Sequence, residues 1–110
     1  MIRGSTPTNR FKSKVDIRNA SEAYMTYAQG DNILFEKTLR DFNITETTVL
    51  AHGKKLLMYI IEIELTQEDT LSFSENKQVE IQLKCKIDNK VLISKVLKAP
   101  VEKVLKEDVI

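Results

Sequence analysis

The side chains able to do acid–base, nucleophilic or metal chemistry are few and far apart in this sequence. There is one histidine, His52, beside Gly53 in a segment typical of a turn, and there is one cysteine, Cys85. A catalytic histidine needs a neighbour that orients its ring, and no partner of that kind stands at a suitable spacing. One histidine and one cysteine are also fewer than the ligands that zinc takes. We therefore expect an exposed turn histidine, no metal and no cofactor.

Two glutamates have the spacing of a catalytic carboxylate pair. Glu62 and Glu64 are two residues apart in an apolar segment, so on a β-strand they share one face. The same spacing is typical of a solvated strand face, where lysines such as Lys84 and Lys86 would balance the charge if those strands were neighbours. We favour the solvated face over the catalytic pair.

Thr66-Gln67-Glu68-Asp69 predicts the start of a short helix. A threonine can accept a hydrogen bond from an amide in the first turn, and a carboxylate three residues later completes a capping box. We therefore interpret Glu68 and Asp69 as helix-end residues and not as calcium ligands, because no loop of spaced oxygens surrounds them. The polar segment Ser74–Lys77 follows closely. The helix is thus expected to have one or two turns and to connect two strands.

The clearest strand is Val79–Ile87, in which every odd position is apolar and every even position is charged or an amide. Successive side chains of a strand point to opposite faces, so this segment predicts one wall of a core with one wet face. Cys85 falls in the apolar register and is expected to be a small buried residue. Asp88–Lys90 favours a turn, and Val91–Leu97 is rich in β-branched residues, so the two segments predict a hairpin.

A second hairpin is predicted between Ala20 and Leu39. Its turn, Gln29–Asn32, is the strongest turn signal of the chain. Lys37 interrupts the apolar face of the second strand, so this end is expected to lie near solvent. The residues expected to face inward are Ala23, Met25 and Tyr27, followed by Ile33, Phe35 and Leu39.

Tyr59–Leu65 is a further strand, whose inward residues are expected to be Ile61, Ile63 and Leu65. Thr47–Ala51 and the turn His52–Lys55 precede it. They fit a hairpin arm, and the alternative is an irregular excursion; we favour the hairpin. The tail Val101–Ile110 fits a strand or a helix, and we favour an edge strand because Pro100 can stand at its start.

These elements predict an all-β domain of about seven or eight short strands with one short helical connection. Long helices of the kind that a βαβ unit requires do not occur. The pattern is typical of an immunoglobulin-like β-sandwich, with a small barrel as the alternative. The 110 residues, 42% hydrophobic and 30% charged, suit one globular domain over residues 1–110. Residues 1–7 are expected to form a short flexible arm.

Charge and hydropathy narrow the classes of partner. The formal net charge is +1, with only a mild basic bias near the start at Arg3, Arg10, Lys12, Lys14 and Arg18, so nucleic-acid binding is not expected. The first residues lack the apolar stretch of a signal peptide, and the apolar run 56–61 is far shorter than the ~20 residues of a membrane helix. We expect synthesis in a cytoplasm and no membrane contact.

A family resemblance rests on five stretches: Met1–Thr8, Tyr27–Gly30, Leu65–Leu71, Val79–Gln82 and Asp108–Ile110. Through them the chain resembles a group of small phage and prophage proteins of Firmicutes. The resemblance implies a virion-associated role in the tail or baseplate region and brings no site residues. The chain is longer than this group between Glu46 and Tyr59, which suggests an elaborated contact element, and it lacks a turn glycine near Asp88. A weaker analogy links it to β-sandwich domains of upper baseplate proteins.

The leading hypothesis is a non-catalytic structural protein of a phage or prophage particle that binds other protein chains. Those partners would be virion components or further copies, held through edge strands. The candidate edges are Thr8–Val15 and Val101–Ile110. The alternative is a soluble cytoplasmic module, encoded by a phage, that modulates a host protein. An enzyme would need a polar pocket around His52 or Glu62, and we do not expect one.

Overall fold

The computed structural model describes residues 1–110 as eight β-strands with one short α-helix and one 3-10 turn. The helix α1 is Gln67–Leu71, and the 3-10 turn η1 is Leu39–Asp41. No helix is both long enough and apolar enough to cross a membrane. The strands are β1 Thr8–Ser13, β2 Glu22–Gln29, β3 Asn32–Thr38, β4 Phe42–Ala51, β5 Lys54–Glu64, β6 Val79–Ile87, β7 Lys90–Ile93 and β8 Leu97–Ala99.

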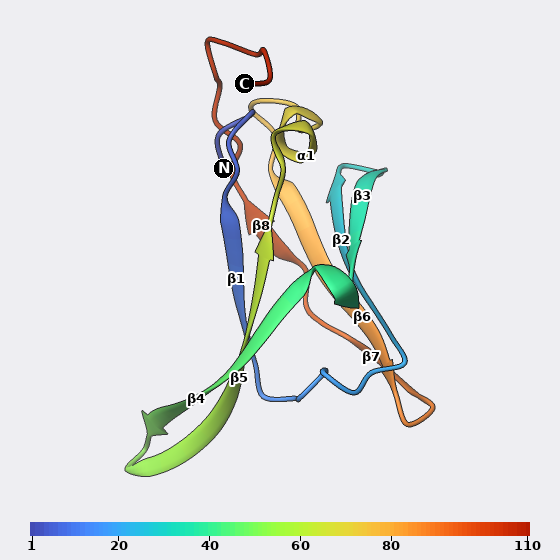
Figure 1. Cartoon of the computed structure of the whole chain (residues 1–110), viewed down its shortest axis with the longest axis vertical. Coiled ribbons are helices and arrows are strands. Elements are labelled where there is room, and N and C mark those ends of the chain that lie inside the picture. The colour runs from blue at the N-terminus through green and yellow to red at the C-terminus, as the bar shows by residue number, and fades with distance from the viewer.

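The strands form two antiparallel sheets, which confirms the predicted all-β sandwich (Figure 1). One sheet has the order β1-β5-β4, and the other has the order β3-β2-β6-β7, with β8 also pairing with β6. These orders correspond to strands B-E-D and C′-C-F-G of the immunoglobulin fold, with α1 in the E–F connection. Strand A of that fold has no counterpart here. The edge of β1 that strand A would cover is therefore open.

The core lies between the two sheets and follows the predicted alternation. Side chains from β2, β5 and β6 point into it because each strand turns every second residue inward. Tyr27 is fully buried and stacks on Phe35 with 4.6 Å between the ring centroids. The buried residues of these three strands that the alternation predicts are Ala23, Met25, Tyr27, Ile61, Ile63, Val79, Ile81 and Cys85.

The predicted strand Val91–Leu97 is divided into β7 and β8. Between the pairs Lys84–Ile93 and Ile81–Leu97, the outer strand has one residue more than β6. Ser94 fills this bulge, because its hydroxyl accepts the amide of Leu83 at 2.9 Å in place of a regular ladder bond. A serine can make this local bond wherever a strand bends, and the bend interrupts the strand.

Two details of the β2–β3 hairpin also differ from the prediction. The register shifts between Tyr27 and Ala28, so Ile33 turns outward and is 66% exposed, not inward. Lys37 is not at a solvent-facing end: its ammonium lies 2.6 Å from a carboxylate oxygen of Asp69, and only 16% of its side chain is exposed. An opposite charge from α1 allows the lysine to lie there.

The predicted edge strand Val101–Ile110 is wrong. Its only pairing is an isolated parallel bridge between Ile2 and Glu102. The physical reason is the end of the neighbouring strand. Ala99 is already opposite Val79, the first residue of β6, so the chain beyond Pro100 has no further strand in that sheet to pair with.

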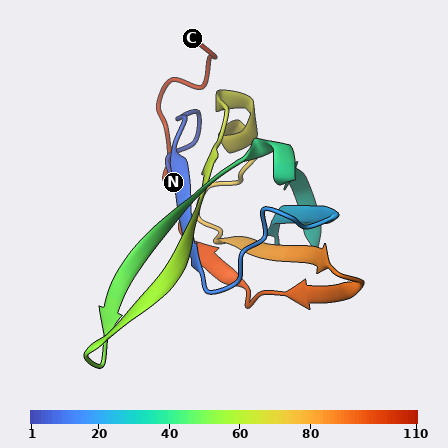
Figure 2. The same cartoon turned by 60° about the horizontal axis from the view of Figure 1, so that its bottom comes forward.

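The predicted hairpin arm is correct and longer than expected. The pairing of β4 with β5 extends without interruption from Phe42–Ile63 to Ala51–Lys54. The far half of this hairpin projects from the body of the domain, as the two views show (Figure 1, Figure 2). The radius of gyration is 15.4 Å, whereas a compact domain of this size has about 13 Å.

Candidate interaction surfaces

The arm begins where the pair Glu46–Tyr59 leaves the body. Arg18, from the loop between β1 and β2, binds both residues there. Its guanidinium lies 2.6 Å from a carboxylate oxygen of Glu46 and 5.4 Å from the centre of the Tyr59 ring. This contact fixes the base of the ribbon, and we define the arm as residues 47–58 beyond it.

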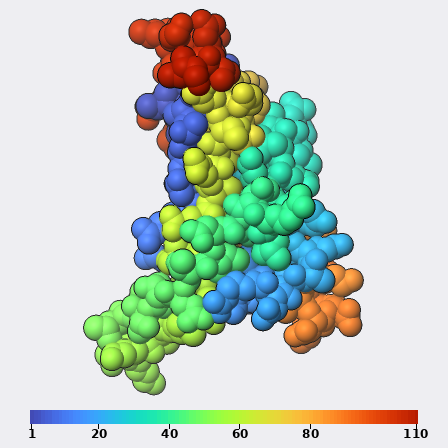
Figure 3. Space-filling view, viewed as in Figure 1, coloured from blue at the N-terminus to red at the C-terminus, as the bar shows by residue number.

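The arm carries apolar side chains on both of its faces. Leu50 is 77% exposed and Leu57 is 51% exposed, and they lie on the face that continues from the core side. Leu56 is 40% exposed and lies on the opposite face, where it is paired with Val49. In the space-filling view the arm extends past the rest of the molecule (Figure 3). Neither face of the arm is covered by the domain itself.

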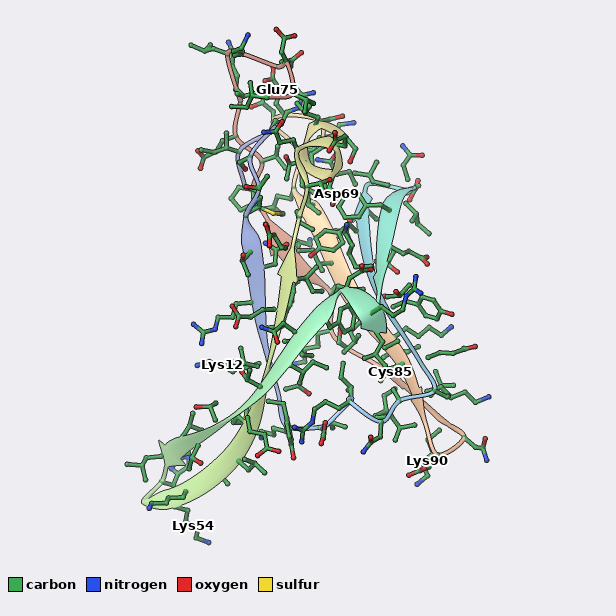
Figure 4. All side chains as sticks on the ribbon, viewed as in Figure 1. Lys12, Lys54, Asp69, Glu75, Cys85 and Lys90 are labelled. Carbon is green, nitrogen blue, oxygen red and sulfur yellow. The ribbon has the colours of Figure 1, made fainter.

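A two-residue turn closes the tip of the arm. His52 and Gly53 have φ values of 52° and 75°, as a type I′ hairpin turn requires at both of its central positions. His52 is exposed there, as predicted. Lys54 follows the turn at the extreme end of the ribbon (Figure 4). The tip is therefore basic, and the strands behind it are apolar.

The second surface is the open edge of β1. The amide of Leu65 donates to the carbonyl of Pro7 at 2.9 Å. This bond shows that the odd-numbered residues of β1 turn their backbone groups toward β5. Backbone groups alternate along an antiparallel strand, so those of Thr8, Arg10 and Lys12 point away from β5. No strand of the chain pairs with them. The prediction that Thr8–Val15 is an edge is confirmed over β1.

A groove of about 190 Å³ lies between this edge and the second sheet. It opens between β1 and the segment that joins β7 to β8, with Ser13 and Ser94 in its lining. Most of the lining is apolar and belongs to both sheets: Phe11, Met25, Ile61, Ile81, Leu83 and Leu97. The groove therefore brings the edge of the hydrophobic core close to solvent, beside a row of free backbone groups.

The two glutamates that have the spacing of a catalytic pair, Glu62 and Glu64, lie opposite residues of their own sheet. Glu62 is directly opposite Arg10 of β1 and Asn43 of β4, whereas Lys84 and Lys86 lie in the other sheet. Glu64 is opposite Thr8. The charge of Glu62 on the solvated strand face is thus balanced by Arg10 of β1 and not by the lysines of β6.

The predicted helix start is confirmed. The amide of Asp69 donates to the hydroxyl of Thr66 at 3.1 Å, and the amide of Thr66 donates to the carboxylate of Asp69 at 2.9 Å. Partial burial opposes ionisation of Asp69, but the hydrogen bonds from Lys37 and Thr66 prevail and hold its pKa below the ordinary value. Nowhere do three His, Cys, Asp or Glu side chains lie close enough together to hold a metal ion.

Cys85 lies on the buried face of β6, as the alternation predicts, and only 3% of it is exposed. Burial raises the pKa of its thiol, because a thiolate would lose hydration there. A raised pKa lowers the thiolate fraction at neutral pH, and the thiolate is the reactive form. The cysteine therefore belongs to the core in its chemistry as well as in its position.

The basic residues near the start of the chain do not form one surface. The guanidinium of Arg3 donates to the carbonyls of Phe73 and Leu71 at 2.7 and 3.1 Å, and this anchors the first residues to the end of α1. Arg10 and Lys12 are exposed on the outer face of β1. The Arg3 contact could not be predicted from the sequence, because its partners are backbone oxygens far along the chain.

The class of protein that this structure defines is an all-β domain of two antiparallel sheets, with a projecting apolar arm and an open sheet edge. No family model and no curated protein matches the chain.

Proposed function

We propose that this chain is a non-catalytic structural protein of a phage or prophage particle and that it acts by binding other protein chains. The observation that carries the proposal is the arm, which exposes Leu50, Leu56 and Leu57 on a two-stranded ribbon. A ribbon of two strands is only marginally stable in water by itself. Apolar side chains gathered on such an element are typical of a contact surface for another protein.

The place of the arm in the sequence supports the same proposal. It occupies the segment between Glu46 and Tyr59, which the resemblance to small phage and prophage proteins predicts to be an elaborated contact element. An insertion at a hairpin tip changes the surface and leaves the core alone. In this proposal the chain is made in the host cytoplasm, needs no cofactor and is then incorporated into the particle.

The proposal is tested by mass spectrometry of purified particles from the phage or lysogen that encodes the chain. We expect the wild-type chain at a fixed ratio to the other structural proteins. Leu50→Lys should reduce that ratio. The matched control Leu105→Lys should not, because Leu105 lies in the C-terminal segment of the chain, away from the arm, and is 91% exposed. Particles without the chain would refute the proposal and favour the cytoplasmic module instead.

A further inference from the structure

We propose that the partner of the open β1 edge is the arm of a second copy of this chain, so that copies join head to tail. This inference rests on the proposed function only in that the chain acts through protein contacts. The strand that pairs would be β4 of the arm, next to Thr8, Arg10 and Lys12 of the neighbouring copy. Leu50 would enter the groove beside that edge.

The edge lacks the two things that an added strand supplies. The outward backbone groups of Thr8, Arg10 and Lys12 have no partner strand, and a fourth strand would satisfy them by β-augmentation. The apolar groove next to them would receive the alternate side chains of that strand. An immunoglobulin-type sheet carries strand A at this position, so the added strand completes the fold.

The arm matches this edge in length. Thr8–Lys12 of β1 and Thr47–Ala51 of β4 each rise by about 17 Å at ~3.4 Å per residue. β4 is the last strand of its sheet, so the edge that it turns away from β5 is free. The strand that would be added, β4, and the edge that would receive it, β1, thus lie on opposite sides of one sheet. Pairing β4 of one copy with β1 of the next would extend that sheet from copy to copy.

The charges are also compatible. Arg10 and Lys12 make the acceptor edge basic, whereas Glu46 is the only charged residue of β4 beyond η1. The lysines of the arm, Lys54 and Lys55, stand on β5. In the paired state they would be two strands from β1, about 10 Å away, where salt screens much of the repulsion. The pairing segment Thr47–Ala51 is uncharged, and Glu46 lies outside it in its ion pair with Arg18, so nothing on this segment repels the basic edge.

Because donor and acceptor are different surfaces, the interface is heterologous. A copy with a defective arm can still receive a neighbour's arm at its β1 edge. A copy with a blocked β1 edge can still add its own arm to a neighbour. This asymmetry makes the inference testable by mixing two variants.

The arm variant is Leu50→Lys, with Leu105→Lys as its matched control. The edge variant is Arg10→Pro, because the amide of Arg10 points to solvent and its loss leaves the ladder with β5 intact. Arg10→Thr is its control, since it removes the charge and keeps the amide. Lys12→Pro is a second edge variant, to be used if thermal melts show that Arg10→Pro does not fold.

Light scattering after size exclusion, on the purified full chain at up to about 1 mM, gives the readout. We expect wild type, Leu105→Lys and Arg10→Thr to associate, and each defective variant to weaken association at least about tenfold. An equimolar mixture of Leu50→Lys and Arg10→Pro should form a dimer of twice the 12.6 kDa chain mass.

Three results would overturn the inference: a monomeric wild type, association that neither variant weakens, or a mixture that stays monomeric while wild type associates. The last of these would indicate a symmetric interface. None of them bears on whether the chain is present in particles, so this test and that of the proposed function fail separately.

Discussion

The hydroxyl of Tyr27 joins the two sheets, and its removal should cost measurable stability. Tyr27 is fully buried, and its hydroxyl donates to the side-chain oxygen of Asn9 on β1 at 2.7 Å. Tyr27→Phe keeps the ring stack on Phe35 and removes only this bond. A buried hydrogen bond contributes about 1–1.5 kcal/mol, and Asn9 is only half-buried, so water can replace part of the loss. We expect the free energy of unfolding to fall by about 1 kcal/mol.

For a chain of this size that loss corresponds to a decrease in Tm of about 4–6 °C. The matched control is Tyr24→Phe, on the same strand, because Tyr24 is 36% exposed and its hydroxyl makes no hydrogen bond within the chain. Its Tm should change by less than about 2 °C. Equal losses for the two variants would refute the reasoning, since Tyr27 would then contribute only as an apolar ring.

The same residue gives a spectroscopic check. Burial, and secondarily the charge of Asp69, raise the pKa of Tyr27 above the ordinary tyrosine value. A raised pKa means that the folded state holds the proton more tightly, so this contribution to stability is complete below about pH 10 and declines above it. Subtracting the absorbance titration of Tyr27→Phe from that of wild type should isolate a step above the usual tyrosine range.

Four further outcomes are expected. Lys37→Met leaves the half-buried carboxylate of Asp69 without its cation, so unfolding should become easier by about 1–2 kcal/mol at pH 7. Lys90→Met, at the exposed start of β7, should have little effect. The lowered pKa of Asp69 contributes stability above about pH 4, which acid titration followed by circular dichroism should show being lost as pH falls further. Cys85 should react with a thiol reagent much more slowly in the folded chain than in denaturant, and equal rates would contradict its burial. Replacing residues 48–57 by Asn-Gly should preserve the fold while abolishing self-association, because a type I′ turn can join the hydrogen-bonded pair Thr47–Met58 at the base of the arm.

The sequence predicted the elements whose signal is local. The alternation of Val79–Ile87 identified β6 and its buried face, and Thr66 with Asp69 identified the start of α1. The turn at His52 identified the arm, although not its full length. In each case neighbouring residues determine the structure through side-chain direction, capping or turn geometry, and a single sequence contains that information.

The features that the sequence did not predict depend on distant residues. The position of Lys37 depends on Asp69, which belongs to another element, and the outward turn of Ile33 depends on a bulge at Tyr27. The tail failed as a strand because β6 begins at Val79, so the sheet had already ended. The edge at Thr8–Val15 was predicted, but the groove beside it was not, since its lining comes from strands of both sheets.

The four outer edges of the two sheets are not alike, and their difference supports assembly through one sheet. In the sheet β3-β2-β6-β7, a register shift at Tyr27 disturbs the edge pair on one side, and the bulge at Ser94 divides the edge strand on the other. Interruptions of this kind prevent unwanted pairing. In the sheet β1-β5-β4, both edge pairs continue without a register shift, and β4 has neither proline nor glycine and a single glutamate between Asn43 and Ala51. A chain that had only to stay monomeric would be expected to interrupt such a strand. Regular edges on one sheet, one donating from an arm and one accepting beside a groove, are what a head-to-tail contact requires.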